Sequence, residues 1–454
     1  MADLAATEPN SRLPWFSRDG AVELLALAWP IILAMLGDST MFLVDSKIVG
    51  KLGDNELAGV SVAQVFMYLS YVTVFGFMRG VKVRTAYAVG RGEPEAALAY
   101  AKAGAWIGAF IGVLVWASGR DLSWVFRVVG ISEPIVPIAT EFYSAITWGA
   151  PGIFVMNALV QHRQGIGDSR TPMVVTIAGN LANAVLAYGL VFGSWGLPRL
   201  GVPGAGYATA IVMTVDGLVL VVLLLRHSKK APSQLPFMGA AAEVASLGAP
   251  TGIQFGLELL AMTTFTSLLG AMNAAEVAAH HIALGVIRFS FLPGSAISEA
   301  TCVLVGQALG RKAPRDAEIA ARTGILLALL FMGACGVVFA IFGSGIARWF
   351  RDSDPVVAIA TKLLLVAAVF QLADAVNIVL RGALRGAKDA RYSAVLSVAA
   401  VWVCIPTAAY FLGRKMHLGA LGGWYGFLAE TTLAAVLLYR RWSKGSWRLA
   451  HNMP

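Results

Sequence analysis

Acidic and amide side chains within otherwise apolar stretches are the residues of this sequence that could do chemistry. Asp38 and Asp45 lie seven residues apart, about two helical turns, so both face one side of the same segment. A carboxylate in such a setting can hold a proton, a sodium ion or an organic cation, but not two of them together. The pattern therefore predicts polar helix faces that are turned toward a cavity or another helix, not toward lipid. The candidates are Asp38, Asp45 and Asn183 in the first half of the chain, and Gln254, Glu258, Phe370, Asp374 and Asn377 in the second.

Each charge inside an apolar span needs a reason, because an ionisable side chain at mid-membrane costs at least about 2.5–3.5 kcal/mol. For the candidate carboxylates we favour a functional site. Other polar residues in the spans, namely Asn157, Gln161 and Asn180, fit equally well as hydrogen-bonded contacts between helices. Structural roles are expected for the remaining carboxylates within spans, Asp216, Glu299 and Glu430.

Arg288 is the clearest basic residue in the middle of a predicted span, and a buried arginine must be paired. It shares a helix face with Glu299, eleven residues later, and it could instead reach Glu258. We therefore treat Arg288 as a possible charge partner and leave its carboxylate open. A tight pair with Glu258 would make that carboxylate structural.

The composition indicates a membrane around most of the chain. Charged residues make up 13% of the 454 residues, against about 25% in soluble domains, and the mean hydropathy is +0.71. So few charges cannot form the polar shell of a soluble enzyme or a nucleic-acid-binding protein, despite a net charge of +9. The three cysteines show no disulfide or metal spacing, so no transition-metal site is expected.

Apolar windows of about 20 residues predict roughly twelve membrane-spanning helices, and hence an all-α membrane protein. Lys and Arg are more frequent in the connections on one side, which predicts that both termini are cytoplasmic. The expected parts are a cytoplasmic lead (1–20), an N-lobe with spans one to six (21–226), a cytoplasmic linker (227–240), a C-lobe with spans seven to twelve (241–440) and a cytoplasmic tail (441–454).

The two halves of the chain resemble each other at a fixed offset. Pro30 and Pro250 are 220 residues apart, and so are Gly90 and Gly310. Because six spans separate the copies, both have the same orientation, and a pseudo-two-fold axis along the membrane normal should relate two six-helix lobes. Such repeats usually surround a central cavity, which favours a transporter over a receptor or an anchored enzyme.

Several stretches then resemble one known family, the multidrug and toxic compound extrusion (MATE) family, over nearly the whole chain. They are LALAWPIILAMLGDSTMFLVDSKIVGKLG, GIGDSRTPM, NAVLAYGLVFG, LGVPGAGYAT, AAHHIAL, VLVGQALG and DAVNIVLRGALRGAKD. The resemblance implies two lobes that exchange protons or sodium ions for bulky, often cationic compounds. Its NorM-like branch implies site carboxylates at Asp45 of the VD[ST] motif, at Glu258, eight residues after Pro250, and at Asp374 of the DA motif. FGFMRG in the second span is instead similar to the DinF-like branch.

The sequence departs from the family pattern at the candidate sites. In the family, the fifth span carries an Asn and, four residues later, an Asn or Asp. Here the first position is Asn183, but the second is Ala187. Asp38 is an additional carboxylate, and we predict that it partly takes over the missing ligand's role, linked to Asp45 by a water or by Asn183. Phe370 stands where the branch often has a tyrosine, which removes a hydroxyl ligand. Glu258 and Asp374 should face one cavity in the C-lobe.

We therefore expect a monomeric, multi-pass protein of the inner membrane that exports organic, often cationic, compounds in exchange for protons or sodium ions, with no other cofactor and no nucleic-acid partner. One alternative is a lipid-linked oligosaccharide flippase. It would line its cavity with basic residues, and Arg79, Lys82 and Arg84 keep this alternative open. A second alternative is a membrane-embedded transferase, for which the short loops offer no metal-binding motif.

Overall fold

The computed structural model describes residues 16–228, 235–270 and 273–449, and within these ranges the chain is helical and contains no strand. The helices of the first half are α1 (Arg18–Val49), α2 (Asp54–Gly90), α3 (Pro94–Ser118), α4 (Ser123–Val128), α5 (Val136–Thr147), α6 (Ala150–Gly165), α7 (Arg170–Phe192), the short η1 (Ser194–Gly196) and α8 (Val202–Ser228). Those of the second half are α9 (Phe237–Gly270), α10 (Ala274–Gly310), α11 (Pro314–Phe350), α12 (Asp354–Gly386), α13 (Ala390–Ala408), the π-helical η2 (Ala409–Lys415), α14 (Ala420–Ser443) and α15 (Ser446–Leu449).

Eleven helices among the described residues are long and apolar enough to cross a membrane, and α5 with α6 passes the same test as a pair. The chain therefore has up to twelve spans, which confirms the predicted all-helical, multi-pass fold. α5 and α6 meet at 53°, so the fourth span is bent where the two helices join. Pro151 lies in the first turn of α6, and a Cβ on Gly149 would lie 2.6 Å from Ala210 Cα of α8. The bend thus lets the backbone approach α8 closely.

The internal repeat reappears as pairs of matched helices. α2 and α10 each have 37 residues, and they begin at Asp54 and Ala274, 220 positions apart. Their ends meet reciprocally: a Cβ on Gly90 would lie 2.2 Å from the Gln307 carbonyl oxygen, and one on Gly310 would lie 2.5 Å from the Tyr87 carbonyl oxygen. Contacts of residue i with j and of j with i mark a two-fold relationship. The pseudo-two-fold axis therefore passes between α2 and α10.

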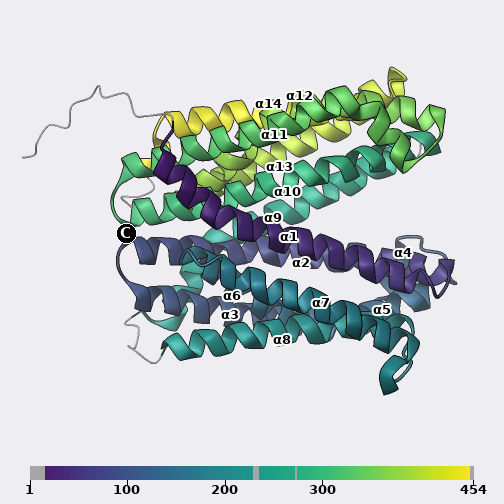
Figure 1. Cartoon of the computed structure of the whole chain (residues 1–454), viewed down its shortest axis with the longest axis horizontal. Helices are drawn as coiled ribbons and strands as arrows, with labels where there is room; N and C mark the ends of the chain where they lie inside the picture. The colour runs from purple at the N-terminus through teal and green to yellow at the C-terminus, as the bar shows by residue number, and fades with distance from the viewer. Residues whose placement is uncertain (1–15, 229–234, 271–272, 450–454) are drawn as a thin grey trace, which may run out of the picture.

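Two helices, α1 and α9, each contact helices of both halves of the molecule. Figure 1 shows α1 running from one half to the other. Leu24 and Leu27 of α1 belong to the buried core formed with α10 and α11, whereas the second half of α1 packs beside α7. Conversely, Ala240 and Val244 of α9 belong to the core formed with α2 and α3. The predicted lobe boundaries remain predictions, and the two helices join the lobes across them.

One end of the molecule carries the connections 91–93, 166–169, 311–313 and 387–389, together with the beginning of α1 and the end of α14. We call it the basic end, because the sequence predicts the positively charged, cytoplasmic side there. Toward this end α2 and α9 touch backbone to backbone. A Cβ on Gly248 would lie 2.1 Å from the Phe77 carbonyl oxygen, and one on Gly80 would lie 2.3 Å from that of Val244. Small residues at facing positions permit this approach.

Candidate functional site

Asp45 is the centre of the polar group in the N-lobe. It lies in the last turn and a half of α1, nearer the helix end than the middle, and only 6% of the residue is exposed. Asn183 Nδ2 of α7 donates a hydrogen bond to Asp45 Oδ1 at 2.9 Å, and Thr209 Oγ1 of α8 donates to Asp45 Oδ2 at 3.3 Å. Three helices therefore position this carboxylate.

The partners of Asp45 are neutral, and this decides what the site can do. A buried carboxylate with hydrogen bonds but no basic partner keeps an uncompensated charge when ionised. Asn183 Oδ1 is also buried and has no hydrogen-bond partner among the described residues. A proton on Asp45, or a cation beside it, would use these oxygen atoms. The sequence pointed to Asn183 but gave no sign of Thr209. Threonine hydroxyls in helices commonly bond their own backbone, as that of Thr209 also does at Ala205 O, so a threonine in a span does not by itself indicate a ligand.

Asp38 has a partner of its own in the structure. Asn180 Nδ2 lies 3.4 Å from Asp38 Oδ1, one turn of α7 before Asn183. Gly37 allows this contact, since a Cβ there would lie 2.9 Å from Asn180 Nδ2. The structure thus gives Asp38 and Asp45 separate asparagines rather than one shared Asn183. Ala187 is fully buried, and its compensation by Asp38 remains a prediction.

The C-lobe group contains an ion pair. Glu258 Oε1 of α9 accepts a hydrogen bond from Gln254 Nε2 at 2.9 Å and is ion-paired with Arg381 Nη2 of α12. Arg381 Nε donates to Ser397 Oγ of α13 at 2.9 Å. The side chains of Glu258 and Arg381 are 19% and 18% exposed. The sequence pattern did not identify Arg381 as the partner of Glu258.

Asp374 and Asn377 lie one turn apart on α12 and are buried. Asp374 Oδ2 and Asn377 Oδ1 have no hydrogen-bond partner among the described residues. The Phe370 ring packs edge-on against Phe427 of α14, with centroids 6.4 Å apart. That Glu258 and Asp374 share one cavity stays a prediction.

The prediction that Arg288 is buried and paired is wrong. The residue is exposed, and both carboxylates considered for it have other basic partners: Arg381 for Glu258, and a separate cluster for Glu299. Pro293 lies in α10 between positions 288 and 299. Because a proline interrupts the regular helix, a face defined by spacing does not continue across it.

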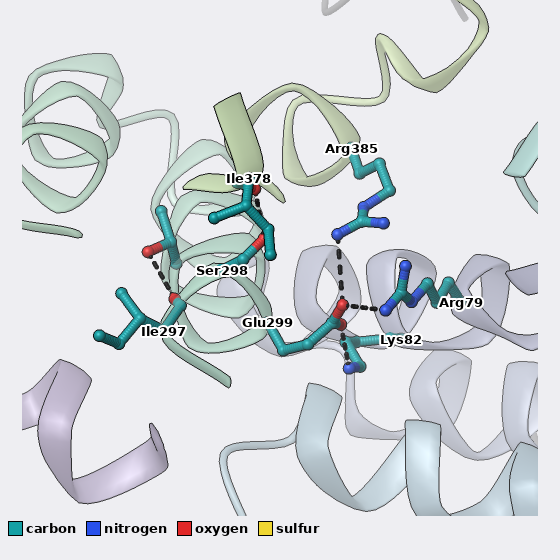
Figure 2. A network of polar contacts seen from close by, with 8 residues as sticks. Arg79, Lys82, Ile297, Ser298, Glu299, Ile378 and Arg385 are labelled. Carbon is teal, nitrogen blue, oxygen red and sulfur yellow. Dashed lines mark hydrogen bonds and ion pairs between the residues drawn. The ribbon is translucent and has the colours of Figure 1, made fainter. Parts of the chain in front are cut away.

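Glu299 lies among three basic side chains that come from two other helices (Figure 2). Lys82 Nζ of α2 lies 2.5 Å from Glu299 Oε2, and Arg385 Nη2 of α12 lies 3.2 Å from Oε1. Arg79 of α2 pairs with the same Oε1. Glu299 is therefore part of a buried network of ion pairs. The flippase alternative depended on Arg79, Lys82 and Arg84. Arg79 and Lys82 pair with Glu299, and Arg84 pairs with Glu243 at 3.0 Å.

Residues 16–228, 235–270 and 273–449 contain no group of three His, Cys, Asp or Glu side chains that could hold a metal ion.

The chain is similar to curated bacterial proteins over almost its whole length. It is 28% identical over 432 residues to the multidrug resistance protein MdtK of Photorhabdus laumondii, which covers 93% of this chain and 94% of the relative. The MdtK of Proteus mirabilis is 27% identical over 436 residues, with the same coverage.

Solved structures share the fold at lower identity. An outward-facing multidrug resistance MATE family transporter of the MOP superfamily superimposes with a TM-score of 0.86 at 21% identity, over 96% of this chain and 97% of that one. The eukaryotic MATE transporter AtDTX14 gives 0.85 at 18% identity, over 95% and 97%.

A family model matches the two repeats separately. The MatE model covers residues 30–189 and 250–410, more than half of the chain, with starts 220 positions apart as in the internal repeat. The chain belongs to the MatE family.

Proposed function

We propose that this transporter is an antiporter that exports organic, often cationic, compounds in exchange for protons or sodium ions. The observation that carries the proposal is Asp45, a buried carboxylate that has two neutral hydrogen-bond donors and, among the described residues, no basic partner. Such a group can take up and release a cation without breaking an ion pair. Membership of the MatE family and similarity to multidrug resistance proteins support export of small organic molecules.

The proposed cycle uses the two lobes differently. A proton or sodium ion binds Asp45 in the N-lobe, with Asn183 and Asp38 nearby. The organic cation binds the C-lobe group of Glu258, Asp374 and their neighbours Gln254, Asn377 and Phe370. Opening alternates between the basic end and the opposite end, so that each ligand is exchanged with a different compartment. A ligand drives this equilibrium only through a difference in affinity for the two forms.

The finer placement of the protein belongs to the same proposal. The basic end faces the cytoplasm, both termini lie on that side, and the protein works as a monomer in the inner membrane. The richness of the basic-end connections in Lys and Arg supports this orientation. The flippase loses its support, since Arg79, Lys82 and Arg84 are ion-paired to carboxylates.

Transport in proteoliposomes tests the proposal. Purified protein is reconstituted with the fluorescent cation ethidium, and proton and sodium gradients are applied separately in otherwise identical buffers. We expect at least one gradient to drive ethidium uphill, and its collapse by an ionophore to abolish transport. Ethidium movement that ignores both gradients would contradict ion coupling, and movement of a fluorescent lipid-linked oligosaccharide instead would support the flippase.

A further inference from the structure

The Glu299 cluster joins the two lobes. Arg79 and Lys82 belong to α2 of the N-lobe, whereas Glu299 and Arg385 belong to α10 and α12 of the C-lobe. The four side chains are between 1% and 7% exposed. Figure 2 shows the carboxylate of Glu299 between the guanidinium groups on one side and the Lys82 ammonium on the other. The closest ion pairs therefore cross the lobe interface.

Further contacts close the same end. Gln307 Nε2 of α10 donates to the Gly165 carbonyl oxygen of α6 at 3.1 Å. Lys388 Nζ, after α12, lies 3.8 Å from the ring centroid of Tyr87 on α2. With the backbone contact of Gly90 and Gly310, these interactions show the basic end in a closed arrangement.

The charges of the cluster do not cancel. Three basic groups surround one carboxylate, and Nε of Arg79 and Nε of Arg385 have no hydrogen-bond partner among the described residues. Without Glu299, three cations would face one another in a buried interface. Removal of one partner from a buried ion pair leaves an uncompensated charge, which is costly to bury. The interface can therefore close only if Glu299 is present and ionised.

The cluster is also asymmetric between the lobes. If α2 moves away from α10 and α12, Arg79 and Lys82 leave together and enter water as free cations. Glu299 keeps Arg385, because both belong to the C-lobe. The carboxylate is thus paired in the closed and in the open form, and only the N-lobe cations change their partner from Glu299 to water.

We propose that Arg79, Lys82, Glu299 and Arg385 form a charge latch that holds the basic end closed and lets it reopen. Glu299 supplies the attraction across the interface. Arg385 lowers the cost of opening, because it neutralises Glu299 once the lobes have parted. The inference rests on the proposed alternation between two open ends, but its test needs neither substrate nor ion gradient.

Distance measurements between the lobes test the latch. Glu95 of α3 and Arg315 of α11 are exposed residues at the basic end, one in each lobe. Both are replaced by spin-labelled cysteines in a chain whose native Cys302, Cys335 and Cys404 are alanine. Double electron–electron resonance then measures the distance distribution in lipid nanodiscs. In the parent protein we expect a short distance between the labels at positions 95 and 315, because the basic end is closed.

Two variants that each remove one charge should behave differently. Glu299→Gln leaves three cations and should raise the ratio of long to short distances by at least about tenfold. Arg385→Gln leaves both cross-lobe pairs and should retain the short distance of the parent. If the cluster were merely structural, Glu299→Gln and Arg385→Gln should change the distance distribution to a similar extent. Asp389→Asn is the matched control, because its pair with Arg441 at 2.8 Å lies at the same end within one lobe.

A charge exchange covers the case in which Glu299→Gln fails to fold. Arg79→Glu combined with Glu299→Arg keeps three positive charges and one negative, with attraction across the same interface, and should restore the short distance. An unchanged distribution in Glu299→Gln, equal opening in Arg385→Gln, or long distances in the exchanged variant would each overturn the latch. Failure of ion-driven ethidium transport with these distance results intact would overturn the proposed function alone.

Discussion

Arg381 of α12 is ion-paired with Glu258 of α9, so the carboxylate proposed to receive an organic cation already holds a cation of the chain itself. Arg381 is fixed by a second contact to Ser397, and Gln254 holds the same oxygen of Glu258. A substrate that binds Glu258 must therefore compete with a tethered guanidinium group. Asp45 in the N-lobe has no such competitor among its hydrogen-bond partners.

Replacement of Arg381 by Gln should tighten substrate binding. The variant frees Glu258 from its partner and keeps a group able to bond Ser397. Because the pair is about one-fifth exposed, the gain is modest, and we expect the KM for ethidium to fall about fivefold. Initial rates of efflux at several ethidium concentrations measure it. Arg381→Lys keeps the positive charge and serves as the control; an unchanged or higher KM in Arg381→Gln would show that Arg381 does not compete.

Asp45→Asn should abolish coupling without loss of the protein. The amide keeps the shape of the carboxylate and can still accept from Thr209, but it lacks the negative charge that takes up a proton or holds a sodium ion. We expect gradient-driven efflux below about one-tenth of the parent rate, with near-normal amounts of protein in the membrane. Asp352→Asn, an exposed aspartate after α11, is the matched control. Full drug resistance of cells that carry Asp45→Asn would remove this residue from the mechanism.

Asp38→Asn should reduce proton-driven efflux less than Asp45→Asn does. Asp38 is less buried than Asp45 and has the longer contact, 3.4 Å to Asn180. If Asp38 takes over part of the role of the missing ligand at Ala187, its loss should shift the pH dependence of efflux and lower the maximal rate. Efflux measured between pH 5.5 and 8.5 in both variants makes the comparison. Parent-like rates across that range would leave Asp38 a structural residue.

Gly248→Ala should destabilise the protein, although alanine favours helices. The new methyl group would lie 2.1 Å from the Phe77 carbonyl oxygen, so α9 and α2 must move apart, at a cost of about 1–3 kcal/mol. Thermal unfolding in detergent measures the effect as a lower Tm. Gly270→Ala lies in the same helix with no atom within 4 Å of the added Cβ, and it should leave Tm unchanged or slightly raised. Equal Tm values in the two variants would contradict close packing of α2 on α9.

The sequence predicted what depends on local patterns and on the repeat. Apolar length gave the spans, and the offset of 220 anticipated the matched α2 and α10. Spacing within one helix also predicted that Asp38 and Asp45 face one side of the same segment. These features follow from helix periodicity and need no knowledge of the partner helix.

Contacts between side chains of different helices could not be predicted from the periodicity of one helix. Thr209 gave no signal, because threonine is common in spans and bonds its own backbone. The partner of Glu258 was sought on α10 at Arg288, but it lies on α12 at Arg381. Which of two arginines reaches a carboxylate depends on helix rotation, and Pro293 alters the helix that carries Arg288. Packing of several helices decided these pairs.

The position of the latch on the repeat has a consequence for how such a molecule can be built. Residues 79 and 299 are 220 positions apart, so Arg79 and Glu299 occupy equivalent positions in the two repeats. An assembly of two identical copies would set like beside like at its axis, arginine against arginine or glutamate against glutamate, and would repel itself there. Fusion of the copies into a single polypeptide frees each to mutate alone. Opposite charges can then meet on the symmetry axis, an attraction that no homodimer of the same unit could make.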